Sequence, residues 1–169
     1  MLSMATLDAV ERRGIRVPHY DRTARFERLA HLAGIVKLSE SDAAWIYPGV
    51  PLADILERIL ELGPRLVAIT TGTLGAVALS REGQTRVPAV PVRVVDTVGA
   101  GDSFGAALIA ALAGQDALAQ GSTRPLDDLL LEEAVVYAVT AAALTCTRRG
   151  AVPPSRTEVD ALLATPPEL

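Results

Sequence analysis

One loop of the sequence combines a carboxylate with backbone that can bind an anion. Residues 94–105 read Val-Val-Asp-Thr-Val-Gly-Ala-Gly-Asp-Ser-Phe-Gly, so a β-prone run leads through small residues into an apolar helix. Gly99, Ala100 and Gly101 let the backbone approach a ligand closely, and the first turn of the helix offers unpaired N–H groups. Asp102 can take the proton of a hydroxyl. A base beside donors for developing negative charge favours phosphoryl transfer to an alcohol over passive binding.

The same residues allow two other interpretations. Residues 99–105 also match a loose G-x-G-x-x-x-G dinucleotide pattern, although Asp102 would then face the pyrophosphate and the motif comes late in the chain. In a purely structural interpretation, Asp102 is an acid in the first turn of a helix and the glycines form an ordinary turn. The second acid, Asp96, and the apolar helix behind the loop weigh against that interpretation. A Walker A loop is excluded because no Gly-Lys-Ser/Thr follows.

The elements that must position this loop alternate between strand and helix. Apolar runs predict strands over 35–38, 66–70, 76–79, 85–87 and 92–95. Helical spacing and stop signals predict helices over 4–13, 23–32, 40–46, 52–62, 103–112, 126–147 (one helix or two joined ones) and 157–163, with an extended piece over 15–18. This order predicts an α/β fold with a mostly parallel sheet flanked by helices in three layers.

Two segments that precede the loop also carry polar groups at strand ends. Ser39 follows the first apolar run as a helix N-cap, and Asp42 closes a capping box with it, an arrangement that needs no ligand. Thr70, Gly72 and Gly75 follow the second run, where they form either a ligand-binding loop or an ordinary tight turn between strands.

Composition limits the classes of protein that fit. The chain has 169 residues, is 50% hydrophobic and 21% charged, and carries a net charge of −4, which excludes disorder, collagen and disulfide scaffolds. Basic residues form no long run, so no nucleic-acid partner is expected. The strongly apolar stretch over 104–113 is too short to span a membrane and no signal peptide is recognised. Cys146 has no second cysteine to pair with, so we expect a reducing cytoplasm.

Residues 96–109 resemble the C-terminal signature of the PfkB family of carbohydrate kinases, the ribokinase and fructokinase group. Three more segments follow the order of that family. Residues 67–76 resemble its T-x-G-x-x-G nucleotide loop, and residues 37–42 occupy the place of its N-x-x-E segment. Residues 146–151 are similar to its late loop, which helps to enclose adenine and a monovalent cation. Lys37-Leu38-Ser39 and Tyr47-Pro48-Gly49 are typical of fructokinase-like members.

The resemblance implies a role for each matching residue. Asp102 would be the base that takes the sugar hydroxyl's proton, and Gly99, Ala100 and Gly101 would form the anion hole. The residues that would contact ATP are Thr70, Gly72, Gly75, Ser39 (where the family has Asn) and Gly150. Asp42 would act on Mg²⁺ through water, and Asp96 with the Val98 carbonyl would hold K⁺. The implied ligands are ATP, Mg²⁺, K⁺ and a small sugar, and the likeness to fructokinases suggests fructose as that sugar.

The resemblance covers residues 24–165 and corresponds to the C-terminal half of the family. We therefore expect residues 1–169 to form a single partial ribokinase-like domain that lacks the N-terminal strands and the β-lid. One hypothesis is an ATP-dependent sugar kinase, which is either completed by a homodimer partner or a separate N-terminal half, or is a truncated copy. The other is a non-catalytic nucleotide-binding remnant or regulatory partner. Both hypotheses predict MgATP binding, and only the first predicts ADP release that depends on a sugar.

Overall fold

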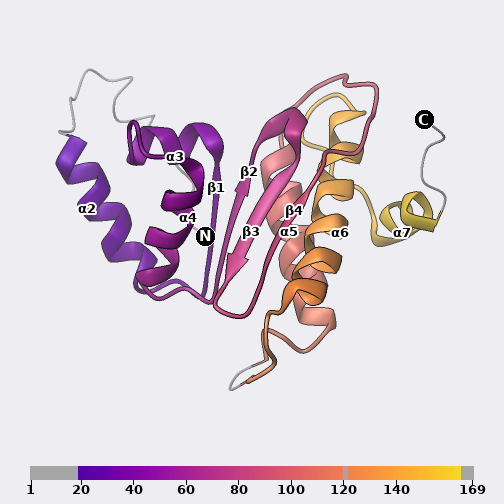
Figure 1. Cartoon of the computed structure of the whole chain (residues 1–169). Coiled ribbons are helices and arrows are strands. Elements are labelled where there is room, and N and C mark those ends of the chain that lie inside the picture. Colours follow the sequence, from indigo (N-terminus) through magenta and orange to yellow (C-terminus); the bar gives the residue numbers. More distant parts are fainter. Residues whose placement is uncertain (1–18, 120–121, 165–169) are drawn as a thin grey trace.

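A four-stranded sheet lies between two layers of helices in the computed structural model, which describes residues 19–119 and 122–164 (Figure 1). The strands are β1 (Ile35–Ser39), β2 (Leu66–Thr70), β3 (Ala76–Ser80) and β4 (Gln84–Val87). The helices are α2 (His19–Ala30), α3 (Glu40–Ile46), α4 (Leu52–Glu61), α5 (Ala100–Gly114), α6 (Asp128–Cys146) and α7 (Arg156–Ala164), with a 3₁₀ turn, η1, over Gly72–Leu74. The helix expected over 4–13 and the extended piece over 15–18 lie outside the described residues.

The strands pair in the order β1-β2-β3-β4, and the sheet is mixed. The α/β class is confirmed, but only β1 and β2 are parallel, whereas β2–β3 and β3–β4 are antiparallel. A parallel return needs a crossover of about a dozen residues or more, and only residues 71–75 join β2 to β3. The short turn therefore reverses the chain, and the expectation of a mostly parallel sheet does not hold for the described strands.

Alternation along β2 divides the core into two parts. Leu66 and Ala68 face the layer formed by α5 and α6, while Val67 and Ile69 face α3 and α4. All four side chains have no exposed surface, because helices cover both faces of this strand. The parallel pair also aligns Ser39 with Thr70, so the carboxyl ends of β1 and β2 present their polar residues at one edge of the sheet.

The predicted strand over 92–95 is wrong. This segment is not part of the sheet, and the side chains of Val94 and Val95 are 58% and 54% exposed. Pro88 and Pro91 precede it and cannot donate to a strand ladder. The N–H of Val95 instead donates to the carbonyl of Cys146, at the end of α6 (2.8 Å), so the segment connects β4 to α5 across the end of α6.

Residues 128–146 form one continuous helix, capped by the side chain of Asp127, which accepts from the N–H of Leu130 (3.0 Å). By length and composition α6 could cross a membrane, a feature that the sequence analysis did not identify. In the fold, 56% of its most apolar window is buried, with Leu131, Ala134 and Ala138 in the core beside α5. This burial is what a core helix of an α/β domain requires.

Candidate active site

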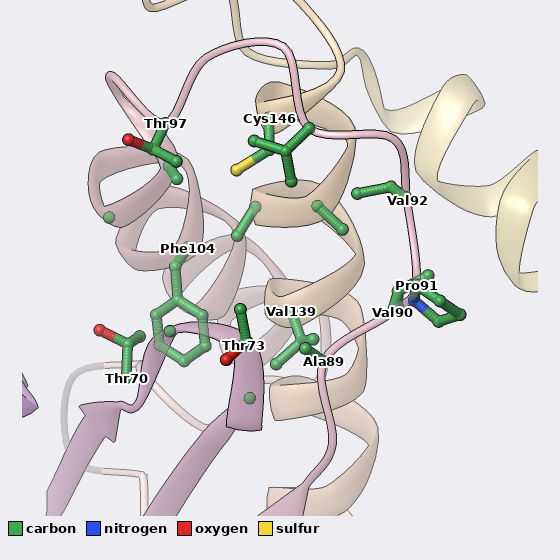
Figure 2. A pocket seen from close by; sticks show the side chains of 17 residues that line it. Thr70, Thr73, Ala89, Val90, Pro91, Val92, Thr97, Phe104, Val139 and Cys146 are labelled. Atoms are coloured by element: carbon green, nitrogen blue, oxygen red, sulfur yellow. The ribbon is translucent and has the colours of Figure 1, made fainter.

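A cavity of about 460 Å³ opens at the carboxyl end of β2, a size in the range of small-molecule sites (Figure 2). Its walls come from the turn after β2, the segment after β4, the first turns of α5 and the end of α6. The lining residues are Thr70, Gly72, Thr73, Gly75, Ala89, Val90, Pro91, Val92, Val94, Thr97, Ala100, Gly101, Phe104, Val139, Ala142, Ala143 and Cys146. Five of the residues predicted to bind ATP or to form the anion hole therefore meet in one place: Thr70, Gly72, Gly75, Ala100 and Gly101.

The cavity has an apolar wall and a few hydroxyl groups. Val139, Ala142 and Ala143 of α6 form much of the apolar wall, and the hydroxyls belong to Thr70, Thr73 and Thr97. The Cys146 side chain, predicted to be a small buried hydrophobe, is half-buried and lines the cavity. Burial raises the pKa of its thiol, and the nearby charge of Asp96 raises that pKa further, so the group remains a neutral thiol. Such a wall suits a flat, uncharged ring system.

The turn after β2 satisfies its own backbone. The N–H of Thr71 donates to the Gly75 carbonyl (2.8 Å), that of Leu74 to Thr71 (3.1 Å), and that of Gly75 to Gly72 (3.1 Å). A Cβ on Gly75 would lie 2.0 Å from the Val87 carbonyl oxygen, and its φ is +98°. The fold thus requires glycine at position 75 whatever binds there.

The start of α5, by contrast, leaves donors open. Gly99 is the N-cap, with φ +81° and no side-chain cap. The Ala100 N–H donates to the Thr97 carbonyl (3.2 Å). Within the described part of the chain, the N–H groups of Gly99, Gly101 and Asp102 have no hydrogen-bond partner. Of the three predicted anion-hole residues, Ala100 already uses its N–H, whereas Asp102 adds one that the sequence analysis did not consider.

Asp102 is exposed in the first turn of α5, near Lys37, a residue that the sequence analysis named in a motif but gave no role in the site. Lys37 lies on β1, and its ammonium is so close to α5 that a Cβ on Gly101 would be 2.9 Å from Nζ. Burial lowers the pKa of Lys37, while the carboxylates of Asp42 and Asp102 oppose that shift. The available signal was a lysine within an otherwise apolar strand, Ile35–Ser39, followed by two acids.

The capping box between Ser39 and Asp42 is present. The Ser39 hydroxyl accepts from the Asp42 N–H (3.1 Å), and Asp42 Oδ2 accepts from the N–H (3.1 Å) and hydroxyl (2.7 Å) of Ser39. The Thr70 hydroxyl, next to Ser39 across the parallel pair, donates to the Leu38 carbonyl (3.4 Å). Asp42 Oδ1 has no hydrogen-bond donor among the described residues, so one oxygen of this carboxylate can bind a ligand.

Asp96 joins its loop to the late loop. Its carboxylate accepts from the N–H groups of Gly150 (2.8 Å) and Val98 (3.1 Å), and the bond from Gly150 is the main reason that its pKa lies below the usual range. Nearby, a Cβ on Gly99 would lie 2.7 Å from Cβ of Ala151. The two loops therefore pack closely beside the start of α5. Gly150 does not line the cavity; its N–H instead holds the Asp96 carboxylate.

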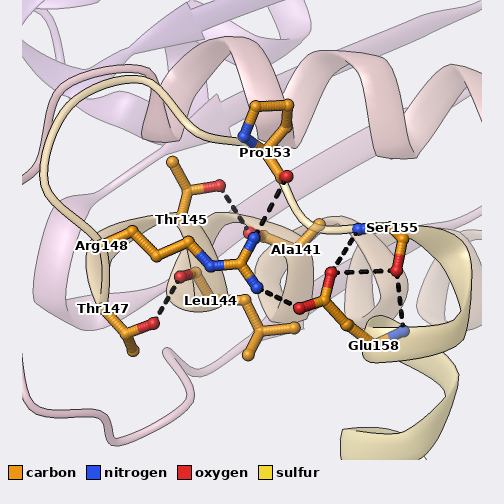
Figure 3. Close-up of polar contacts among 8 residues, drawn as sticks. All are labelled: Ala141, Leu144, Thr145, Thr147, Arg148, Pro153, Ser155 and Glu158. Carbon is orange, nitrogen blue, oxygen red and sulfur yellow. Dashed lines mark hydrogen bonds and ion pairs between the residues drawn. The ribbon is translucent and has the colours of Figure 1, made fainter.

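Arg148 fixes the late loop to α7, as Figure 3 shows. Its guanidinium donates to the Pro153 carbonyl (3.2 Å) and forms an ion pair with Glu158. The other Glu158 oxygen accepts from the N–H (2.8 Å) and hydroxyl (2.9 Å) of Ser155, which precedes α7. Beneath the loop, the Thr145 hydroxyl donates to the Ser103 hydroxyl (2.7 Å), a buried contact between α6 and α5.

The carboxylates near α5 suit a metal ion that takes most of its ligands from a bound molecule and from water. No cluster of three or more His, Cys, Asp or Glu residues occurs in residues 19–119 and 122–164. Magnesium does not require one, because it is commonly bound through one or two carboxylates, phosphate oxygens and water. Asp42 and Asp102, both close to Lys37, provide carboxylates of that kind.

Comparisons with known proteins agree with these observations. The family model described as pfkB family carbohydrate kinase matches residues 9–158. A fructokinase from Salmonella thompson is 38% identical over 130 residues, which are 76% of this chain and 56% of that protein. The first curated relatives are thus matched over roughly half their length: the fructokinase from Salmonella typhimurium is 38% identical over 40% of its length.

Solved structures of two relatives share the fold. A putative ribokinase II from E. coli, in complex with ATP and Mg²⁺, is 27% identical with a TM-score of 0.68, covering 96% of this chain and 46% of its own. The fructokinase from Vibrio cholerae, bound to fructose, ADP and calcium, is 27% identical with a TM-score of 0.69, covering 83% and 44%. A double mutant of that fructokinase is in a form bound to fructose, ADP and potassium.

Proposed function

Because the chain belongs to the PfkB family of carbohydrate kinases, we propose that it binds MgATP and carries out the phosphoryl-transfer part of a fructokinase-like reaction. The observation that carries this proposal is the place of Gly101, which lines the cavity and has an open N–H next to Asp102. A nucleotide seated in the cavity thereby brings its phosphates to the start of α5.

The two ends of the cavity suit the two ends of the nucleotide. The adenine ring lies against the apolar wall of α6 at Val139 and Ala143, since flat apolar surface is buried there at little cost. Thr70, Gly72 and Gly75 line the ribose and the first phosphates. The terminal phosphates lie at the N-terminus of α5, where open N–H groups and the helix dipole favour negative charge.

Asp102 acts as the base for the acceptor. Its carboxylate takes the proton of a sugar hydroxyl as the oxygen of that hydroxyl forms a bond to the terminal phosphorus. The bond from that phosphorus to the bridging oxygen breaks, and ADP leaves with the electron pair. The open N–H groups of Gly99, Gly101 and Asp102 bind the oxygens on which charge develops in the transition state.

Two cations complete the proposal. Mg²⁺ would neutralise the charge of the phosphates when bound, and the free Oδ1 of Asp42 would hold it, directly or through water. For K⁺ we propose Asp96 and the carbonyl of Val98: the Asp96 oxygens accept from the N–H groups of Val98 and Gly150 and keep lone pairs for a cation. The ATP–Mg²⁺ and potassium forms of the structural relatives support binding of these two cations.

The groups that bind the sugar would come from outside the described residues, either from another segment or from a second chain. Within the described part of the chain, β1 pairs on one side only, with β2, which leaves its other edge open beside Lys37. Ile109, about two turns along α5 from Asp102, is 44% exposed. An open strand edge and exposed apolar helix surface are places where a further strand and helix can pack.

The test measures nucleotide binding and turnover separately. Calorimetry of the full chain with MgATP should show binding at one site, and ADP release should require fructose. Asp102→Asn should bind MgATP but lose about 10²-fold to 10⁴-fold in turnover, as expected when a general base is removed. Asp54→Asn is the matched control, because Asp54 is an exposed acid in the first turn of another helix, α4.

Each possible result decides between the hypotheses. Absence of MgATP binding contradicts the proposed function. Binding without any ADP release that depends on a sugar supports the alternative, a non-catalytic nucleotide-binding protein or regulatory partner. Turnover that survives Asp102→Asn removes Asp102 from the role of base.

A further inference from the structure

Lys37 is the only lysine of the chain; the other fifteen basic residues are arginines. Arginine carries a broad planar guanidinium that suits paired hydrogen bonds, whereas the lysine ammonium is a compact point charge on a flexible stem. A chain that uses arginine everywhere else thus has a compact cation at one position, and that position is in β1 at the edge of the candidate site.

Within residues 19–119 and 122–164, the Lys37 ammonium has no close partner of opposite charge. It is close enough to Gly101 that a Cβ there would be 2.9 Å away. Burial lowers its pKa, and Asp42 and Asp102 are near enough to oppose that shift, yet no carboxylate among the described residues forms an ion pair with it within 4 Å. Burial has removed part of its water, and a cation with less water and no close partner attracts an anion strongly.

Steric room also favours an ammonium. The approach to Gly101 leaves no space for even one added carbon, so a guanidinium, which extends further than an ammonium, would have to displace α5 or turn away from it. The same closeness explains the glycine at position 101, because a side chain there would push Nζ out of its position.

The anion that fits is the group transferred by the proposed reaction. Lys37 is beside Asp102, the base for the acceptor hydroxyl, and the phosphoryl group must lie next to that base when it is transferred. The open N–H groups of Gly101 and Asp102 lie at the same place. Phosphates nearer the ribose would lie further back, along the cavity wall formed by Thr70 and Gly72.

We propose that Lys37 is a further catalytic residue, whose ammonium binds the non-bridging oxygens of the terminal phosphoryl group of the nucleotide while that group passes to the acceptor. The inference rests on the proposed function. Lys37 forms no covalent bond and keeps its proton throughout; Asp102 accepts the only proton that is transferred. The Lys37 ammonium has a second effect: it compensates the negative charge of Asp102, which would otherwise repel the phosphoryl group that Asp102 has to approach.

A comparison of ATP with ADP tests the contact. Lys37→Met removes the charge and keeps a side chain of similar length, and it should weaken MgATP binding about tenfold or more, the value of one charge-assisted hydrogen bond. MgADP binding should change much less, because ADP lacks the terminal group. The matched control is Arg81→Met, which removes one positive charge from the exposed turn after β3, at the other end of the sheet.

Two results would overturn the inference: unchanged MgATP affinity in Lys37→Met, or equal losses for ATP and ADP. Lys37→Arg keeps the charge and should bind MgATP as weakly as Lys37→Met. Full recovery of affinity in Lys37→Arg would contradict the requirement for a compact cation.

Chemical labelling of the unaltered chain gives an independent readout that does not depend on how a variant folds. The reagent 2,4,6-trinitrobenzenesulfonate modifies amines, and the amines of the chain are Lys37 and the α-amino group, which serves as internal reference. MgATP at ten times its Kd should slow labelling of Lys37 about tenfold, the ratio set by occupancy, and leave the reference unchanged. Binding of MgATP without protection of Lys37 overturns this inference alone, whereas a chain that binds no MgATP overturns the proposed function itself.

Discussion

The two glycine-containing loops of the site differ in what their glycines are for. In the turn over residues 71–75, three backbone hydrogen bonds close the loop on itself, and Gly75 is packed against the Val87 carbonyl. The loop over residues 96–101 is held to the late loop by the bond that its Asp96 carboxylate accepts from the Gly150 N–H, and the N–H groups of Gly99, Gly101 and Asp102 are left open. A motif glycine can therefore be a requirement of the fold or an opening for a ligand, and the state of the neighbouring donors separates the two.

The largest expected effect belongs to the closed turn. Gly75→Ala should destabilise the protein by about 3 kcal/mol or more, because the new methyl would lie 2.0 Å from the Val87 carbonyl oxygen and the residue would keep φ +98°. Chemical denaturation measures the loss. Gly34→Ala is the control, since a Cβ at Gly34 meets nothing within 4 Å. Equal stability of the two variants would show that β4 shifts freely and that the turn is not a structural requirement.

Gly99→Ala should lower the free energy of unfolding by less, about 1–3 kcal/mol, because residue 99 has a φ of +81° and its new methyl would approach Ala151. The contact is with a methyl group on the late loop, which can move further than a strand carbonyl. The same denaturation experiment should show part of this cost recovered in the double variant Gly99→Ala, Ala151→Gly. A double variant no more stable than Gly99→Ala would place the whole cost in the backbone.

Gly101→Ala tests the open loop and should change binding rather than folding. Alanine suits a helix better than glycine does, and the only atom within 4 Å of its methyl would be Lys37 Nζ, the end of a flexible side chain. We expect unchanged or slightly higher stability and about tenfold weaker MgATP binding by calorimetry, because the ammonium is displaced. A large loss of stability would show that Gly101, like Gly75, is required by the fold, and would contradict the difference between the two loops.

The smallest effect concerns the anchor of the open loop. Backbone N–H donors, Gly150 first, lower the pKa of Asp96 in the folded protein. The stabilisation is therefore fully present above the unfolded value of about 3.9 and is lost as the pH falls through the folded value. Melting temperatures of the wild type and Asp96→Asn should differ at pH 7 and converge on acidification below about pH 4. A difference that stays constant down to pH 2 would show that the carboxylate charge is not what anchors the loop.

Much of the fold could be predicted because it depends on local signals. The helix over 40–46 begins at a capping box formed by residues three apart, and the strand over 66–70 is an unbroken apolar run. The failures have a common cause. The run over 92–95 has the composition of a strand, but its backbone bonds to α6, more than fifty residues further along the chain. The direction of β3 depended on the length of a turn, not on strand composition.

The candidate site divides in the same way. The order and spacing of Thr70, Gly72, Gly99, Gly101 and Asp102 are visible in the sequence, because each short motif is one loop with its own backbone requirements. The packing of α5, α6 and the late loop decides which of these residues share the cavity. It also decides that Gly150 lies outside the cavity and donates its N–H to Asp96.

The sequence by itself determined the α/β class, the family motifs and the carboxylate beside a glycine loop, since these rest on preferences within a few residues of one another. Only the tertiary structure decided that the Gly150 N–H donates to Asp96 and that the one lysine, on the first described strand, lies against the start of a helix sixty-four residues later. Contacts between distant segments follow from how buried surfaces fit together, and no local pattern encodes that fit.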